Sequence, residues 1–257
     1  MNRPDRSSPG HRRPRFFVRP NCFHREADPP WVELDPDNIH HLRRVLRLNA
    51  GARVALFDGT GREYLAEVAE SRPNRVELKV LSATRPAVES PLRVTLAQAL
   101  LKGNAFDRVL TDAAELGARA IVPIVSSRTV VHARRAEVEA KVKRWEKILE
   151  AAAAQSGRVL VPRIEYPTSL DEFIRREGEG LRLMLREGAG PGSQLPETSG
   201  PEITLLSGPE GGFDDKEAEA ALARGFRRWS LGPRILRADT AGPAALAILQ
   251  HRFGDGQ

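Results

Sequence analysis

The sequence has very little cysteine and no long hydrophobic run. A single thiol, Cys22, stands among 257 residues, so an internal disulfide framework and multi-cysteine zinc or iron–sulfur sites are excluded. No uncharged apolar run approaches the roughly 20 residues that a membrane-spanning helix needs. The basic N-terminus has no apolar stretch behind it, which argues against a secretory signal. We therefore expect a cytoplasmic protein.

Charged residues are plentiful. The chain is 40% hydrophobic and 29% charged, as expected of an ordinary globular protein. Its 40 Lys and Arg outnumber its 34 Asp and Glu, which gives a formal net charge of +6. This excess alone is only weak evidence for a nucleic-acid partner. The six histidines show no metal-ligand spacing, so we expect no metal site.

The N-terminal part has short β-like segments. Residues 1–14 carry Pro, Ser, Gly and Arg with nothing to bury, which predicts a disordered basic tail. In residues 15–82, short alternating runs are separated by turn residues such as those at 58–61. A helix is expected over 37–48, where apolar residues recur at helical spacing. This pattern predicts a small β-barrel with one helix.

The helix expected over 37–48 has two different faces. Its inward face is apolar and consists of Ile39, Leu42, Val45 and Leu46. Its other face is basic and consists of His40, Arg43, Arg44 and Arg47. A basic face is often only solvated surface, but beside a basic tail on a small β-domain it also suits contact with phosphates. Together with Arg15, these four side chains are our candidates for binding nucleic acid.

The C-terminal part alternates strands and helices. Residues 83–91, rich in Pro and small residues, predict a linker to an α/β domain over 92–254. An apolar strand at 92–100, a helix over 104–116 and a strand at 120–125 form a βαβ unit, so a parallel sheet is expected. Further strands are predicted at 181–185, 203–207 and 227–231. Further helices are predicted over 134–155, after caps at Ser169 and Asp214, and over 240–252, burying Ala244, Ala245, Ile248 and Leu249.

Two glycine-rich segments, at 207–213 and 231–240, each follow a predicted strand and precede a helix. Ligands of open α/β sheets bind at the carboxyl ends of the strands, where glycine lets the backbone approach them closely. On neighbouring strands, both loops would open at one edge of the sheet. They are either a ligand site or simple connections. The glycine spacings of dinucleotide and P-loop sites are missing, which disfavours a nicotinamide-dependent enzyme.

Several segments resemble the RsmE family of SPOUT-class methyltransferases. They are KGNAFDRVLTDAAELGARAIVPIVSSRT at 102–129, AAAAQSGR at 151–158, GPEGGF at 208–213 and LGPRILRADTA at 231–241. HHLRRVLRL at 40–48 and the following LFDGTGREYLAEV extend the resemblance to almost everything except the tail. The resemblance implies S-adenosylmethionine-dependent methylation of N3 of a uridine in 16S ribosomal RNA, free or within the small ribosomal subunit.

The resemblance also implies an architecture. An N-terminal PUA-like β-barrel would bind RNA, and a C-terminal SPOUT-type α/β domain would be tied in a deep trefoil knot, an exception to the rule that chains do not thread. The cofactor would sit in the knot, and the active unit would be a homodimer. The pocket walls would be Leu206, Gly208, Pro209, Gly211, Gly212, Leu231, Gly232, Ile235, Leu236 and Arg237.

For catalysis, we expect Arg237 to stabilise negative charge on the uracil carbonyls. Glu210 is the expected side-chain base, with a loop hydrogen bond or a dimer contact as the alternative. The chain departs from the family where it has Ala238-Asp239 in place of Thr-Glu, and Ala154 in place of Glu. Two other functions stay open: methylation of another RNA nucleotide or of a ribose 2′-OH, and non-catalytic RNA binding in ribosome assembly.

Overall fold

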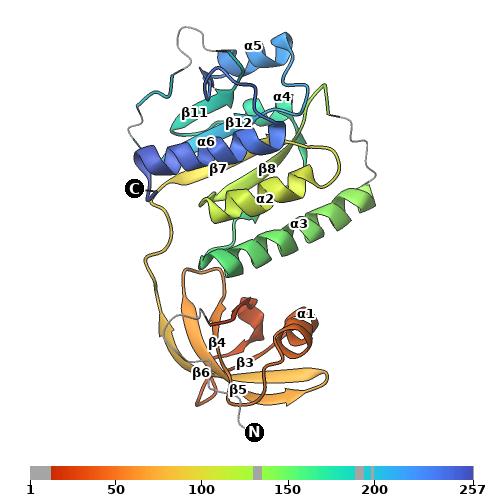
Figure 1. Ribbon diagram of the computed structural model, residues 1–257, viewed down its shortest axis with the longest axis vertical. Helices are drawn as coiled ribbons and strands as arrows, with labels where there is room; N and C mark the ends of the chain where they lie inside the picture. Colours follow the sequence, from red (N-terminus) through yellow and green to blue (C-terminus); the bar gives the residue numbers. More distant parts are fainter. Residues whose placement is uncertain (1–12, 130–134, 189–193, 198–199, 257) are drawn as a thin grey trace. The chain divides into compact units, whose positions relative to one another are not determined.

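The computed structural model describes residues 13–129, 135–188, 194–197 and 200–256 (Figure 1). The predicted tail at 1–14 lies almost entirely outside the described residues. The chain divides into two compact units, Met1–Val88 with Gly157–Leu160, and Glu89–Ser156 with Val161–Gln257. The strand β6 extends to Thr84, two residues into the segment predicted as a linker.

The N-terminal unit is built on a six-stranded sheet in the order β1-β4-β5-β6-β3-β2. Its elements are β1 (Arg15–Phe17), η1 (Pro20–Cys22), β2 (Phe23–His24), β3 (Trp31–Glu33), β4 (Arg53–Phe57), β5 (Glu63–Arg72) and β6 (Arg75–Thr84). Neighbouring strands are antiparallel except β1 and β4, which are parallel. Within the described residues β1 and β2 do not pair with each other, so the hydrogen-bonded sheet is open, whereas a barrel was predicted.

The turn between β4 and β5 is organised by a buried carboxylate. Asp58 accepts hydrogen bonds from the backbone N–H of Thr60 at 3.0 Å, from the Tyr64 hydroxyl at 2.9 Å and from the Arg25 guanidinium at 3.0 Å. Burial by itself would raise the pKa of Asp58. The hydrogen bonds from the hydroxyl and the backbone N–H of Thr60, followed by the Tyr64 hydrogen bond and the charge of Arg25, outweigh burial and lower the pKa below its ordinary value. Gly59, at φ +76°, takes the left-handed conformation that this turn requires.

The predicted helix over 37–48 is shorter and partly irregular. An α-helix, α1 (Pro36–His40), passes into a π-helical turn, η2 (His41–Val45), in which the Leu46 N–H donates to the carbonyl of His41. A π-turn holds more residues than an α-turn, so the following side chains rotate around the axis. Val45 is therefore 59% exposed, and its predicted inward position was wrong. The earlier apolar positions, Ile39 and Leu42, are buried as predicted.

The C-terminal unit contains a seven-stranded sheet in the order β10-β8-β7-β12-β11-β13, with β9 also pairing with β8. Its strands are β7 (Arg93–Ala99), β8 (Ala120–Val125), β9 (Arg163–Ile164), β10 (Thr168–Ser169), β11 (Leu181–Leu185), β12 (Glu202–Ser207) and β13 (Arg227–Trp229). Every pairing is parallel, which confirms the prediction of a parallel sheet.

Helices pack on both faces of this sheet, as alternating strand side chains require. One core joins the sheet to α2 (Ala105–Glu115), α3 (Arg135–Ser156) and α6 (Ala238–Phe253). A second core joins it to α4 (Leu170–Ile174) and α5 (Asp215–Ala223). In β12, Leu205 belongs to the first core and Leu206 to the second. No helix in the described residues is both long and apolar enough to cross a bilayer.

The helix ends confirm two of the predicted caps. Ser169 accepts from the backbone of Glu172, and Asp214 forms a capping box with Glu217. One prediction about α6 was wrong: Ile248 is 40% exposed. The helix buries Leu246 instead, because its contact face is rotated relative to the predicted one.

Candidate active site

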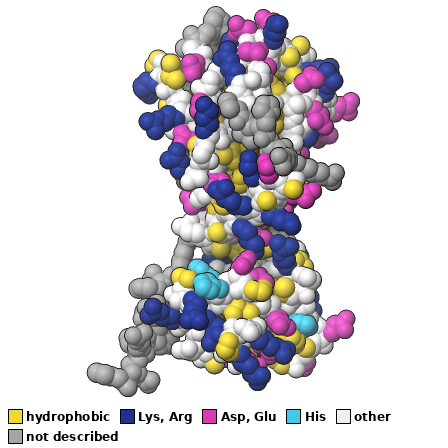
Figure 2. Space-filling model, turned by 90° about the vertical axis from the view of Figure 1, so that its right-hand side faces the viewer, with side chains coloured by type: hydrophobic (Ala, Val, Ile, Leu, Met, Phe, Trp, Pro, Cys, Tyr) yellow, Lys and Arg dark blue, Asp and Glu magenta, His cyan; other side chains and the backbone are white. Residues whose placement is uncertain are grey.

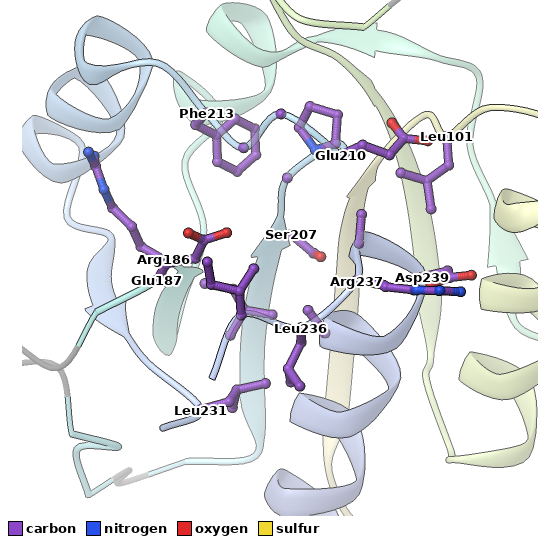
Figure 3. Close-up of a pocket in the computed structure, with 18 of the residues that line it drawn as sticks. Leu101, Arg186, Glu187, Ser207, Glu210, Phe213, Leu231, Leu236, Arg237 and Asp239 are labelled. Atoms are coloured by element: carbon purple, nitrogen blue, oxygen red, sulfur yellow. The ribbon is translucent and has the colours of Figure 1, made fainter. Parts of the chain in front are cut away.

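A cavity of about 820 Å³ opens at the carboxyl edge of the parallel sheet (Figure 3). Most of its lining comes from the two glycine-rich loops, at 207–213 after β12 and at 230–237 before α6. The loop after β11 adds residues 185–187, while Leu101 after β7 and Arg128 after β8 complete the wall. The carboxyl ends of five strands therefore meet at one cavity, where ligands of open α/β sheets bind.

All but one of the predicted pocket residues line this cavity. They are Gly208, Pro209, Glu210, Gly211, Gly212, Leu231, Gly232, Ile235, Leu236 and Arg237. The exception is Leu206, which is fully buried in the core against α4 and α5 and does not line the cavity. Successive side chains of a strand point to opposite faces, and the next residue, Ser207, lies in the lining instead.

The loop after β11 was not among the site segments predicted from the sequence. Strands β12 and β13 follow one another along the chain, but they are not neighbours in the sheet, because β11 lies between them. This placement brings Leu185, Arg186 and Glu187 to the cavity. The sequence did contain a signal for this loop, because Arg186 and Glu187 directly follow the strand predicted at 181–185. Position after a strand is also what indicated the glycine-rich loops.

Neighbouring loops hold the first glycine-rich loop in place. The N–H of Gly212 donates to the carbonyl of Pro209 at 2.9 Å and closes a tight turn. The Glu210 carboxylate accepts from the backbone N–H of Lys102 at 3.0 Å, and Figure 3 shows it beside Leu101 at the rim. On the other side, the Arg128 guanidinium donates to the carbonyl of Gly211. The side chain of Glu210 is thus bound to the loop after β7.

The start of α5 is fastened to the loop after β8. Asp214 accepts from the backbone N–H of Glu217 at 2.8 Å and from the Ser127 hydroxyl at 3.0 Å. The backbone N–H of Ser127 donates to the Glu217 carboxylate at 2.7 Å. The pKa of Asp214 is lowered, first by the hydrogen bond from the backbone N–H of Glu217 and then by the hydrogen bond from the Ser127 hydroxyl.

The second glycine-rich loop has fewer side-chain anchors. Ser230 and Gly232 exchange hydrogen bonds at 3.1 and 3.4 Å, and Gly232 adopts φ +118°. Ile235 is 75% exposed at the mouth of the cavity. Within the described part of the chain, the side chains of Arg234 and Arg237 have no hydrogen bond or ion pair. Two arginines are thus available to negatively charged groups that approach the cavity.

Comparison with known proteins identifies the family. A family model described as an RNA methyltransferase domain matches residues 88–250, and an RNA methyltransferase PUA domain matches residues 34–81. The chain is 36% identical over 222 residues to "Ribosomal RNA small subunit methyltransferase E" of Synechocystis sp., covering 84% of this chain and 71% of that protein. The chain belongs to the ribosomal RNA small subunit methyltransferase E family. This finding confirms the resemblance seen in the sequence.

Solved structures agree with this family and with its fold. The family member of Neisseria gonorrhoeae, solved bound to S-adenosyl methionine, has a TM-score of 0.85 and 32% identity, covering 96% of this chain and 100% of that one. A Legionella pneumophila protein solved with the cofactor SAM has a TM-score of 0.84 and 32% identity, covering 95% and 100%. The fold is therefore the α/β methyltransferase fold, combined with a PUA domain.

Two of the residues that depart from the family pattern, Ala238 and Asp239, line the cavity, whereas the third, Ala154, lies on α3 outside its lining. The Asp239 carboxylate pairs with the Arg108 guanidinium of α2. Burial raises the pKa of the nearby Asp112, and the charge of Asp239 raises it further, while Arg108 lowers it. Asp239 is thus engaged by a cation on the neighbouring helix.

The basic face expected on the PUA domain is exposed. His40, Arg44 and Arg47 are exposed and Arg43 is half-buried. None of these four side chains has an ion pair within the described residues. Figure 2 shows Lys and Arg side chains beside histidines on the N-terminal unit.

Arg15 differs from these four side chains. Its guanidinium pairs with Glu63 and donates to the carbonyl of Arg158 at 2.8 Å. Its side chain is 14% exposed. These internal contacts occupy a side chain that the sequence analysis had counted among the RNA contacts.

Proposed function

We propose that the protein transfers a methyl group from S-adenosylmethionine to N3 of a uridine in 16S ribosomal RNA, free or within the small ribosomal subunit. One observation carries the proposal: both glycine-rich loops line one cavity at the carboxyl edge of a parallel sheet. The chain belongs to a family whose N. gonorrhoeae member was solved with this cofactor in place. We also propose that the protein acts in the cytoplasm, where a ribosomal substrate is found.

The residues of the cavity fit this cofactor. The volume of the cavity, about 820 Å³, lies within the range of small-molecule sites, roughly 300–1,000 Å³. The hydroxyl oxygen of Ser207 is buried at the cavity and has no hydrogen-bond partner in the described residues. A Cβ on Gly208 would approach the Phe213 ring to 3.3 Å, so glycine permits the close turn there. We propose that backbone groups of both loops bind the adenosine.

Further parts of the proposal follow from family membership. We propose that residues 15–82 form the RNA-binding domain and 92–254 the SPOUT methyltransferase domain, with a deep trefoil knot around the cavity. We also propose a homodimer, for which the exposed Ile248 on α6 provides apolar surface. Sedimentation of the purified protein tests the dimer: a monomer at micromolar concentration would refute it.

The mechanism assigns separate tasks to the pocket residues. When bound, the cofactor supplies a methyl group activated by its positively charged sulfur. The loops align this group with the uracil, and alignment can contribute several kcal/mol. We propose that Arg237, whose side chain has no partner among the described residues, stabilises the negative charge that develops on the uracil carbonyls. Glu210 was the base predicted from the sequence, but its contact with Lys102 directs it to the rim.

The test uses the purified protein, labelled S-adenosylmethionine and small ribosomal subunits that lack the modification. Digestion and mass spectrometry should locate the label on N3 of one uridine. A label on another base or on a ribose would change the assigned target. Absence of both the label and cofactor binding would instead support a non-catalytic role in ribosome assembly.

A further inference from the structure

We infer that Glu187, in the loop after β11, accepts the proton of uridine N3 during methyl transfer. This role rests on the proposed function, and Glu187 was not among the site residues predicted from the sequence. Uridine N3 carries a proton at neutral pH, so a group in the cavity has to remove it before or during the transfer.

Among the described residues, three carboxylates line the cavity, and two of these carboxylates have partners outside it. Glu210 accepts from the backbone of Lys102, and Asp239 pairs with Arg108. Glu187 has no hydrogen bond or ion pair with any described residue. It is the pocket carboxylate with both oxygens available, and a general base must reach its proton directly or through one water.

The structure holds Glu187 at the cavity through the residue before it. The backbone N–H of Arg186 donates to the carbonyl of Trp229 at 3.0 Å, which extends the pairing of β11 with β13. The guanidinium of Arg186 pairs with Asp215 of α5 at 2.6 Å. Figure 3 shows the Glu187 carboxylate on the β11 side of the cavity and Arg237 on the α6 side.

This arrangement places a proton acceptor and a cation on opposite sides of the cavity. In the step, the N3–H bond breaks and the proton passes to the Glu187 carboxylate. The electron pair left on N3 forms the bond to the methyl carbon, while the carbon–sulfur bond breaks and its pair stays on sulfur. Arg237 faces the carbonyl oxygens, which share the negative charge. No further reactant is needed for the atoms and electrons to balance.

The test is Glu187→Gln, assayed for methylation of unmodified small subunits as a function of pH. We expect turnover near neutral pH to fall by about 10²-fold or more, in line with the contribution of a general base. Turnover should recover as the pH rises, because hydroxide then removes the N3 proton. Subunits assembled with 5-fluorouridine-substituted RNA, whose N3 proton is more acidic, should also restore turnover at neutral pH. Cofactor affinity, measured by calorimetry, should stay unchanged.

Two variants serve as controls. Glu219→Gln changes an exposed carboxylate on α5 outside the cavity and should leave the pH profile unaltered. Glu210→Gln changes the carboxylate bound to Lys102, and its effect should not be reversed by high pH or by 5-fluorouridine.

Other outcomes overturn the inference. Weaker cofactor binding in Glu187→Gln would make Glu187 a cofactor contact. Wild-type turnover in this variant would rule Glu187 out as the base. The same conclusion would follow if high pH or 5-fluorouridine restored turnover in Glu210→Gln but not in Glu187→Gln. If the wild-type protein methylates no uridine N3, the proposed function itself fails.

Discussion

The two glycine-rich loops of the cavity are held in different ways. The loop after β12 is bound on both sides, by Lys102 at Glu210 and by Arg128 at Gly211. The loop before α6 has a local hydrogen-bond exchange around Gly232 and carries two arginine side chains without partners among the described residues. One loop is thus fixed before any ligand binds, whereas the other presents free cations.

This difference suggests a division of labour between cofactor and RNA. A preorganised loop binds a small ligand without losing conformational entropy, which favours the β12 loop as the main cofactor wall. Free guanidinium groups suit the phosphates and carbonyls of RNA, because Arg makes planar, charge-assisted hydrogen bonds. The following substitutions separate the two roles.

The largest effect is expected for Arg237→Ala. Removing a cation that stabilises negative charge in the transition state should lower turnover by about 10²–10³-fold. Cofactor affinity should change little, because the β12 loop is untouched. Steady-state kinetics and calorimetry on the same preparation measure both quantities. Equal losses in turnover and cofactor affinity would move Arg237 to a binding role.

Gly211→Val should act on the other loop. A Cβ at this position would lie 3.2 Å from Cδ of Arg128, so a branched side chain displaces the arginine that holds the loop. We expect the displaced loop to lower cofactor affinity by about tenfold, which corresponds to about 1.4 kcal/mol. RNA affinity should remain, and Gly211→Ala should show a smaller loss. Unchanged cofactor affinity by calorimetry would contradict the assignment of this loop.

Reversal of Arg43, Arg44 and Arg47 to Glu tests the basic face of the PUA domain. We expect weaker RNA binding with a flatter salt dependence, because each lost phosphate contact removes about 0.7–0.9 from the slope of log K against log salt. Cofactor affinity should be unaffected. Reversal of Arg72 and Arg75, which pair with acidic neighbours, serves as the control. An unaltered slope would mean that the basic face is only solvated surface.

Local sequence signals predicted much of the fold. The strand at Ala120–Val125 and the helix starting after Asp214 have the predicted positions, because apolar runs and capping residues act over a few residues. The glycine-rich loops were found for the same reason. Each follows a strand, and parallel strands bring such loops to one edge of the sheet.

The wrong predictions concern features that depend on contacts between remote segments or on irregular backbone geometry. The polar pair after β11 was a local signal, but the order β12-β11-β13 depends on pairing between remote segments. The sequence therefore did not show that Glu187 would lie at the same cavity as the glycine-rich loops. Val45 was misplaced because a helical period of 3.6 residues does not hold through the π-turn at His41–Val45. Leu206 was misplaced because its side chain lies on the face of β12 that packs against α4 and α5, whereas the next residue, Ser207, lies on the cavity side.

The smallest effect is expected from low pH. Acid should weaken the attachment of the loop after β12 before that of the loop before α6. The folded protein lowers the pKa of Asp214 below the value of about 3.9 expected for an unfolded chain. The stabilisation is therefore complete above that value and is lost as the pH falls through the lower folded-state pKa. Thermal midpoints of wild type and Asp214→Asn should diverge above about pH 4 and converge at lower pH, since Asn cannot titrate but still accepts the capping hydrogen bond. If the two midpoints differ by the same amount from pH 6 to pH 2.5, the hydrogen bonds to Asp214 do not contribute to stability through its charge, and the contrast between the two loops must depend on Arg128 and Glu210 alone.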